Sequence, residues 1–194
     1  MEITSVVIRV KPELLRQALD RLSATDIIAN TNTRTRPMIL NPDLDLSVTR
    51  HIAASPARIW TAWSDPVELA KWWCPRPWTT QVKAFDFRPG GAFHTLMTGP
   101  DGVDTSDNPG AFVAITPYSQ IILTSALLGD WRPAHQPWMP MTAIFTFEAQ
   151  GEGTRYTATA MHPDKATCAS HAQMGFNEGW TTCMDQLAEL VEGS

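Results

Sequence analysis

The sequence predicts an α+β fold in which a curved antiparallel sheet wraps around a long C-terminal helix. Two observations predict it. Segments with two-residue alternation follow one another from about residue 79 to residue 161, and an apolar stripe at helical spacing then runs to residue 192. Successive strands followed by one long helix favour a sheet with that helix on one face. The length of 194 residues is that of a single domain.

The first 45 residues differ from the rest of the chain. β-branched residues from Ile3 to Val10 predict a strand, and leucines at helical spacing predict a short helix that ends near Ser23. Polar residues and prolines follow. We therefore expect residues 1–45 to form an N-terminal appendage and linker, and residues 46–194 to form the main domain. The appendage is expected to pack on the domain, to mediate a homodimer or to be mobile.

The main domain is predicted to start with one strand, residues 46–52, and two short helices. Ser55-Pro56 and Asp65-Pro66 each place a capping side chain before a proline, which suits the first position of a helix. We predict helices over residues 56–63 and 66–73.

Six further strands are predicted from alternation and from the turn residues between them. They cover residues 79–88, 92–98, 110–116, 120–128, 141–148 and 154–161. Pro89-Gly90-Gly91 and Gly151-Glu152-Gly153 predict tight turns, whereas residues 99–109 and the proline-rich residues 129–140 are predicted to be loops.

The chain is predicted to close with one amphipathic helix over residues 170–192. Its apolar stripe consists of Phe176, Trp180, Cys183, Met184, Leu187, Leu190 and Val191. The opposite face carries Asn177, Glu178, Thr182, Gln186 and Glu189. At 1.5 Å per residue such a helix is roughly 30 Å long, enough to cross a sheet. A strongly twisted sheet that curls around it leaves room for a small-molecule pocket.

Composition excludes several classes of protein. The net charge of −5 argues against a nucleic-acid partner. No apolar run approaches the roughly 20 residues needed to span a bilayer, so we expect no membrane insertion. The N-terminus lacks the pattern of a signal peptide, and the three cysteines, Cys74, Cys168 and Cys183, show no pairing pattern. We expect a cytoplasmic protein.

Short motifs in a fixed order then identify a family. They are ASPARIW at 54–60, WSDP at 63–66, KWW at 71–73, FRPGG at 87–91, GAFVAITP at 110–117, GTRY at 153–156, GW at 179–180 and MDQL at 184–187. In this order and spacing the chain from about residue 46 to 192 resembles the START and birch-pollen-allergen superfamily (SRPBCC). The branch it resembles is that of homologues of the activator of the heat-shock protein 90 ATPase.

The resemblance implies a START-like helix-grip fold with a cavity between helix and sheet. It does not imply one function, because the superfamily includes lipid carriers, hormone receptors, polyketide cyclases and co-chaperones. Residues 1–45 lie outside the resemblance.

Aromatic and methionine side chains are the candidates for lining such a pocket, with core packing as the alternative for each of them. The candidates are Trp63, Trp73, Phe93, Met97, Phe112, Trp131, Trp138, Phe145, Met161, Phe176, Trp180 and Met184. Trp131 and Trp138 lie on the proline-rich loop and are predicted to form a lid. Gly179 beside Trp180 is predicted either to let the helix approach the sheet or to leave room for a ligand.

Polar candidates are fewer. The histidines His94, His135, His162 and His171 are candidate acids, bases or pocket donors, and we select His94 and His162 as the catalytic candidates. Cys168 and His171 are three residues apart with no second pair, so we predict no metal site. The sequence has no phosphate-binding glycine loop and no nucleophile motif, and we expect no cofactor.

Three functions follow as hypotheses. The leading one is non-catalytic binding of a small hydrophobic or aromatic ligand. The second is a chaperone-associated or other protein-interaction role, which the resemblance alone motivates. The third is an enzyme of cyclase, dehydratase or hydrolase type that uses a pocket histidine.

Overall fold

Seven strands form one antiparallel sheet in the order β1-β9-β8-β5-β4-β3-β2. Their bounds are β1 Asp45–Ile52, β2 Thr79–Phe85, β3 Ala92–Thr98, β4 Thr105–Thr116, β5 Gln120–Thr124, β8 Thr142–Gln150 and β9 Gly153–Met161. A second, two-stranded sheet pairs β6 (Leu127–Leu128) with β7 (Arg132–Pro133) around a short 3-10 turn, Gly129–Trp131. This computed structural model describes residues 38–192. The predicted strand and helix of the N-terminal appendage lie outside the described residues, so the division at residue 45 stays a prediction.

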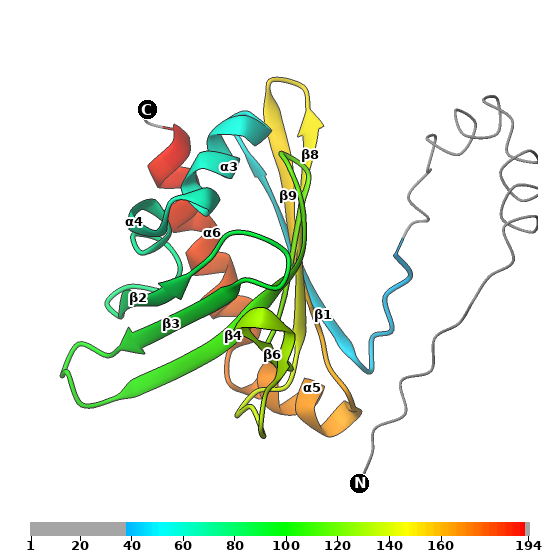
Figure 1. Cartoon of the computed structure of the whole chain (residues 1–194). Coiled ribbons are helices and arrows are strands. Elements are labelled where there is room, and N and C mark those ends of the chain that lie inside the picture. The colour runs from blue at the N-terminus through cyan, green and yellow to red at the C-terminus, as the bar shows by residue number, and fades with distance from the viewer. Residues whose placement is uncertain (1–37, 193–194) are drawn as a thin grey trace, which may run out of the picture. The chain divides into compact units, whose positions relative to one another are not determined.

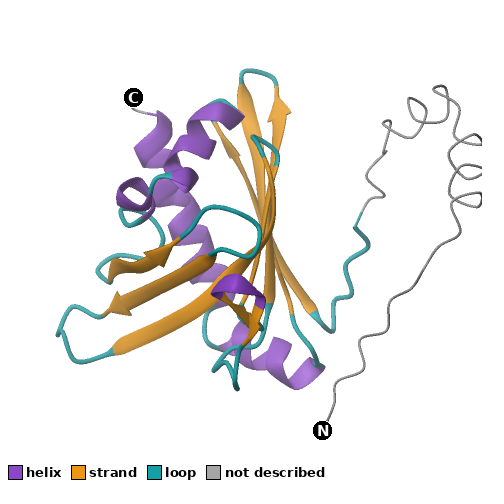
Figure 2. Cartoon of the chain, in the orientation of Figure 1, coloured by secondary structure: helices purple, strands orange, loops and turns teal. Residues whose placement is uncertain are grey.

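Four helices accompany the sheet in the described part of the chain. They are α3 (Pro56–Ser64), α4 (Pro66–Leu69), α5 (Lys165–Gln173) and α6 (Phe176–Glu192). Figure 1 shows α6 crossing the concave side of the bent sheet, with α3 and α4 near its C-terminal end and α5 at the other end. An ion pair between Arg50 on β1 and Asp185 on α6 links the helix to the edge of the sheet. The predicted α+β architecture is confirmed, and Figure 2 shows its strands and helices by type.

The helix starts follow the predicted local chemistry. The Ser55 side chain accepts a hydrogen bond from the Arg58 backbone N–H, and the Asp65 carboxylate accepts from Val67 and Glu68. Each cap satisfies backbone donors that the first helical turn leaves free. The second helix is shorter than predicted, because α4 ends at Leu69 and a turn follows it.

Three strand boundaries were predicted wrongly. β2 ends at Phe85, three residues early, and the predicted strand 120–128 is divided into β5 and β6. The second half of the supposed loop at 99–109 is strand, since β4 begins at Thr105 and pairs with β3 from Thr98↔Thr105 onward. The segment 105–109 is polar, and its pairing with β3, a tertiary contact, determines its conformation.

The single C-terminal helix predicted over residues 170–192 is two helices. Gly175, between α5 and α6, has φ +89°, a conformation that side chains other than glycine's rarely adopt. The break allows α5 and α6 to differ in direction, which places residues of both beside the sheet (Figure 1).

Gln186 was predicted on the polar face of the C-terminal helix and is in fact buried, with 4% exposure. Its amide Nε2 donates to the carbonyls of Trp72 (3.2 Å) and Cys74 (2.8 Å), and its Oε1 accepts from the backbone N–H of Arg76 (2.8 Å). One side chain thus satisfies three backbone groups of the loop between α4 and β2. The amphipathic pattern misplaced Gln186 because its partners belong to a segment 110 residues away in sequence.

Candidate ligand-binding site

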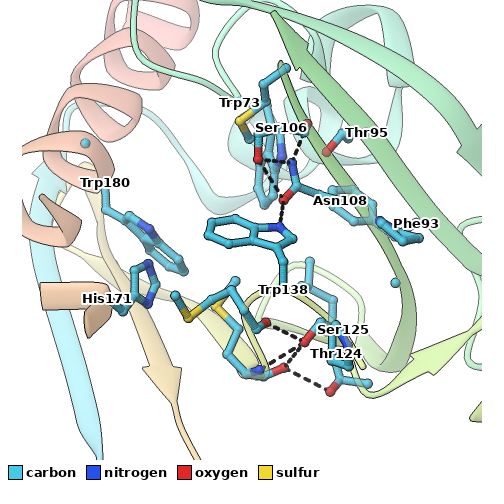
Figure 3. Close-up of a pocket in the computed structure, with 18 of the residues that line it drawn as sticks. Trp73, Phe93, Thr95, Ser106, Asn108, Thr124, Ser125, Trp138, His171 and Trp180 are labelled. Carbon is cyan, nitrogen blue, oxygen red and sulfur yellow. Dashed lines mark hydrogen bonds between the residues drawn. The ribbon is translucent and has the colours of Figure 1, made fainter. Parts of the chain in front are cut away.

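A pocket of about 690 Å³ lies between the sheet and helix α6. Strands β3, β4, β5, β8 and β9 supply one wall, and the α5–α6 segment supplies another. The rest of the lining comes from Trp72, Trp73 and Pro75 and from the segment between β5 and β8. Figure 3 shows Trp180 and His171 on one side, Phe93, Thr95 and Asn108 on the other, and Trp138 between them.

Eight of the twelve predicted pocket residues line this pocket. They are Trp73, Phe93, Met97, Trp138, Phe145, Phe176, Trp180 and Met184. Several of their rings are in mutual contact: Phe145 and Trp180 are stacked at a centroid distance of 5.9 Å, and Trp73 meets Phe93 edge-on at 5.0 Å. Such contacts between rings help to order the aromatic walls of the pocket.

Trp63 and Phe112 do not line the pocket and are core residues. Both have 0% exposure. Trp63 is enclosed by Trp72, Trp73 and Phe145, and Phe112 by Phe85, Phe87 and Phe93. The rings that surround them come from other elements of the fold, which sequence periodicity does not locate.

Trp131 and Met161 are also absent from the pocket lining. Trp131 is 51% exposed and packs over Gly90, where a Cβ atom would lie 2.3 Å from the Trp131 Nε1 atom. Gly90, with φ +78°, therefore serves both the predicted turn and this close contact. Met161 lies on the opposite face of β9 from the pocket. Tyr156 and Ala158 on the same strand line the pocket, and because successive side chains of a strand point to opposite faces, Met161 points away from it.

Gly179 lines the pocket and leaves it open. A Cβ atom built on Gly179 would have no neighbour within 4 Å. Of the two predicted roles for this glycine, close helix approach is thus wrong, and open space in front of α6 is what the structure shows. Since glycine costs a helix interior about 1 kcal/mol relative to alanine, its place in α6 is not explained by helix stability.

The proline-rich loop contributes Trp138 to the pocket lining, although this side chain is 59% exposed. The Trp138 indole N–H donates to Asn108 Oδ1 at 2.9 Å, which connects the loop to β4 (Figure 3). At the base of the loop, the Ser125 hydroxyl donates to the Met139 carbonyl at 2.8 Å, and Met139 is buried. The loop is therefore anchored at its base, while Trp138 is held at the mouth by one exposed hydrogen bond.

Neither predicted catalytic histidine lines the pocket. His94 Nε2 lies 2.8 Å from the Asp107 carboxylate in an exposed pair. His162 is buried behind His171, whose Nδ1 is 2.8 Å from His162 Nε2. The histidines that do line the pocket are His135 and His171. Both were candidates that were not selected from the sequence. His171 was missed because the break at Gly175, which brings α5 to the pocket, was not predicted.

The deep part of the pocket is uncharged at neutral pH. Burial, and secondarily His162, lowers the pKa of His171 to about 4. Burial raises the pKa of the Tyr156 phenol well above its usual value, and it raises that of Cys183 to about 12. Asp107 is the one acidic or basic side chain among the described lining residues apart from histidine, and its carboxylate is exposed and pairs with His94. The interior therefore suits an uncharged ligand.

Within residues 38–192, no group of three or more His, Cys, Asp or Glu side chains is arranged to hold a metal ion. The cysteines Cys74, Cys168 and Cys183 are all free. In the same part of the chain, no helix is both long enough and apolar enough to cross a bilayer.

Solved structures resemble this fold over nearly their whole length. A protein from Nitrosomonas europaea is 38% identical, with a TM-score of 0.74, over 79% of this chain and 97% of that chain. A protein from Mycobacterium smegmatis is 28% identical, with a TM-score of 0.66, over 78% and 92%. An AHSA1-like protein from Aeromonas hydrophila is 21% identical, with a TM-score of 0.60 over 77% and 93%, and shows the shared fold.

No curated protein matches the chain significantly. Residues 53–192 match the family described as Activator of Hsp90 ATPase homolog 1-like protein. That span contains every one of the motifs, from ASPARIW at 54–60 to MDQL at 184–187, together with the whole pocket lining. The sequence motifs, the sheet order and the family match agree, and the chain therefore belongs to the Activator of Hsp90 ATPase homolog 1-like family, within the START-like superfamily.

Proposed function

We propose that this domain binds a small hydrophobic or aromatic molecule, without catalysis, in the pocket between the sheet and α6. The observation that carries the proposal is an aromatic-lined pocket of about 690 Å³ next to a helix glycine with open space before it. Ligand pockets typically measure about 300–1,000 Å³ and are mostly apolar with a few polar groups. A pocket of this size accommodates a molecule of two or three fused or linked rings.

The alternatives have less support. The enzyme hypothesis requires a pocket histidine, and its selected candidates, His94 and His162, do not line the pocket. His135 and His171 do line it, but His171 is hydrogen-bonded to another histidine, His162. The protein-interaction hypothesis, with a chaperone or a second copy as partner, rests on the family description and on residues 1–45, and no contact of the described residues favours it. The free cysteines are consistent with the reducing cytoplasm that we expect for this protein.

The proposal predicts that Gly179→Leu weakens binding of N-phenyl-1-naphthylamine, a neutral aromatic fluorophore, by at least about tenfold. The leucine side chain would occupy space that the ligand needs, and tenfold corresponds to about 1.4 kcal/mol. Leucine is a better helix former than glycine, so the melting temperature should stay the same or rise. Fluorescence titration of the full-length protein measures the affinity.

Asn177→Leu is the matched control, because it adds the same side chain to an exposed position of α6. This variant should bind the fluorophore as the parent does. Native mass spectrometry of freshly purified protein adds an independent measurement, in which a retained small molecule supports the proposal. Equal affinities for the parent and the Gly179→Leu variant would show that the fluorophore binds elsewhere.

A further inference from the structure

Two buried histidines form a chain of hydrogen bonds that starts at the backbone before β1 and ends at the pocket. His162 Nδ1 lies 2.8 Å from the Leu44 carbonyl oxygen, and His162 Nε2 lies 2.8 Å from His171 Nδ1. The His162 backbone N–H donates to the same carbonyl at 3.0 Å. The two side chains are 6% and 8% exposed.

The partners of these nitrogens determine where the protons are. A carbonyl oxygen can only accept, so His162 Nδ1 must carry a proton. In a neutral imidazole the other nitrogen is then an acceptor, and His162 Nε2 receives its hydrogen bond from His171 Nδ1–H. By the same rule, His171 Nε2 carries no proton. The Leu44 carbonyl thus determines the tautomer of His171 through His162, although it does not contact His171.

His171 Nε2 is the end of the chain. His171 lines the pocket beside Trp180 (Figure 3). Among the described residues no hydrogen bond is formed to His171 Nε2. The side-chain atoms that are both unpaired and completely enclosed by protein do not include this nitrogen. A bare acceptor with no protein partner, on a side chain more than nine-tenths buried, is therefore available to a molecule in the pocket.

We propose that His171 Nε2 accepts a hydrogen bond from the ligand, so that the pocket selects aromatic or hydrophobic molecules that carry a hydroxyl or N–H donor. This inference rests on the proposed function and defines the chemical class of its ligand. A molecule without a donor would cover His171 Nε2 and leave a buried acceptor unpaired, which lowers affinity.

Two features make His171 the group that distinguishes ligands with a hydrogen-bond donor from ligands without one. Burial keeps its imidazole neutral, with a pKa of about 4, so it does not become a donor near neutral pH. The other buried polar side chains of the lining, Thr95, Thr124 and Tyr156, carry hydroxyls, which can both donate and accept and so tolerate either kind of ligand. An unprotonated imidazole nitrogen can only accept.

The test compares 2-naphthol with 2-methoxynaphthalene at pH 7.5, by tryptophan fluorescence titration of the full-length protein. The two probes share one ring system, and the ether lacks the donor while burying one more methyl group. Apolar burial alone would favour the ether. We expect the parent protein to bind 2-naphthol about fivefold more tightly, the scale of one net hydrogen bond.

His171→Phe should abolish this preference while retaining an aromatic ring beside Phe176 and Trp180. His94→Phe, the matched control outside the pocket, should retain it. If both probes bind the parent equally, or if the preference persists in His171→Phe, the inference is wrong and the proposed function stands. If neither probe binds, both fail.

A measurement on the unmodified protein makes the test independent of the folding of any variant. Long-range ¹H–¹⁵N NMR spectra at pH 7.5 distinguish protonated from unprotonated ring nitrogens. We expect Nδ1–H tautomers for both His162 and His171. A protonated His171 Nε2 would overturn the inference.

Discussion

Replacing Gln186 with leucine is expected to lower the free energy of unfolding by about 3 kcal/mol or more. The leucine side chain has a similar volume but leaves the Trp72 and Cys74 carbonyls and the Arg76 N–H without their partner. Each buried polar group left unpaired costs about 1–3 kcal/mol. Urea denaturation at pH 7, followed by tryptophan fluorescence, measures the change.

Glu189→Gln is the control, because Glu189 lies on the same helix as Gln186 and contacts the same loop. Glu189 pairs with Arg76 at 3.1 Å, but both side chains are 63% exposed. Exposed ion pairs contribute about 0–1 kcal/mol, so this variant should differ little from the parent. A Gln186→Leu variant as stable as Glu189→Gln would show that the loop between α4 and β2 does not need the amide.

Lowering the pH from 7 to 5 is expected to reduce the free energy of unfolding by about 2 kcal/mol through His171 alone. Its pKa is about 4 in the folded protein and 6.5 in an unfolded chain. Between these values the unfolded state binds the additional proton, so stability falls as the pH falls below about 6.5 and levels off below about 4. Each pKa unit is worth about 1.4 kcal/mol.

Urea denaturation at pH 7 and pH 5 tests this, since most carboxylates stay ionised over that interval. NMR titration of the His171 ring measures its pKa directly. His51→Gln, which removes an exposed histidine on β1, should leave the pH dependence unchanged. A His171 pKa near 6.5, with equal stability at both pH values, would contradict the prediction.

Much of the fold follows from local patterns. Ser55-Pro56 and Asp65-Pro66 start the helices that they predict, because a cap and a proline act within one helical turn. The inward stripe of α6 places Phe176 and Met184 in the buried interior, as the helical period requires. Residues 105–109 were missed as strand because their own composition is that of a loop and only the β3 pairing makes them extended.

The candidate site was less predictable. Trp73, Phe93 and Trp180 line the pocket as expected, but Trp63 and Phe112 have the same character and are enclosed by other rings. Alternation identifies which residues share a face of the sheet. It does not tell which residues on that face are covered by other side chains and which border the pocket. For Gly179 the sequence allowed two roles, and the atoms around it decided between them.

The sequence by itself determined the family, the α+β architecture, the starts of α3 and α4 and the apolar stripe of the last helix. These depend on interactions between residues a few positions apart, or on motifs. The tertiary structure alone decided that His171 reaches the pocket in place of His94 and His162, that Gln186 is buried, and that Trp138, not Trp131, stands at the mouth. Each of these depends on contacts between segments far apart in the chain, and no local pattern encodes them.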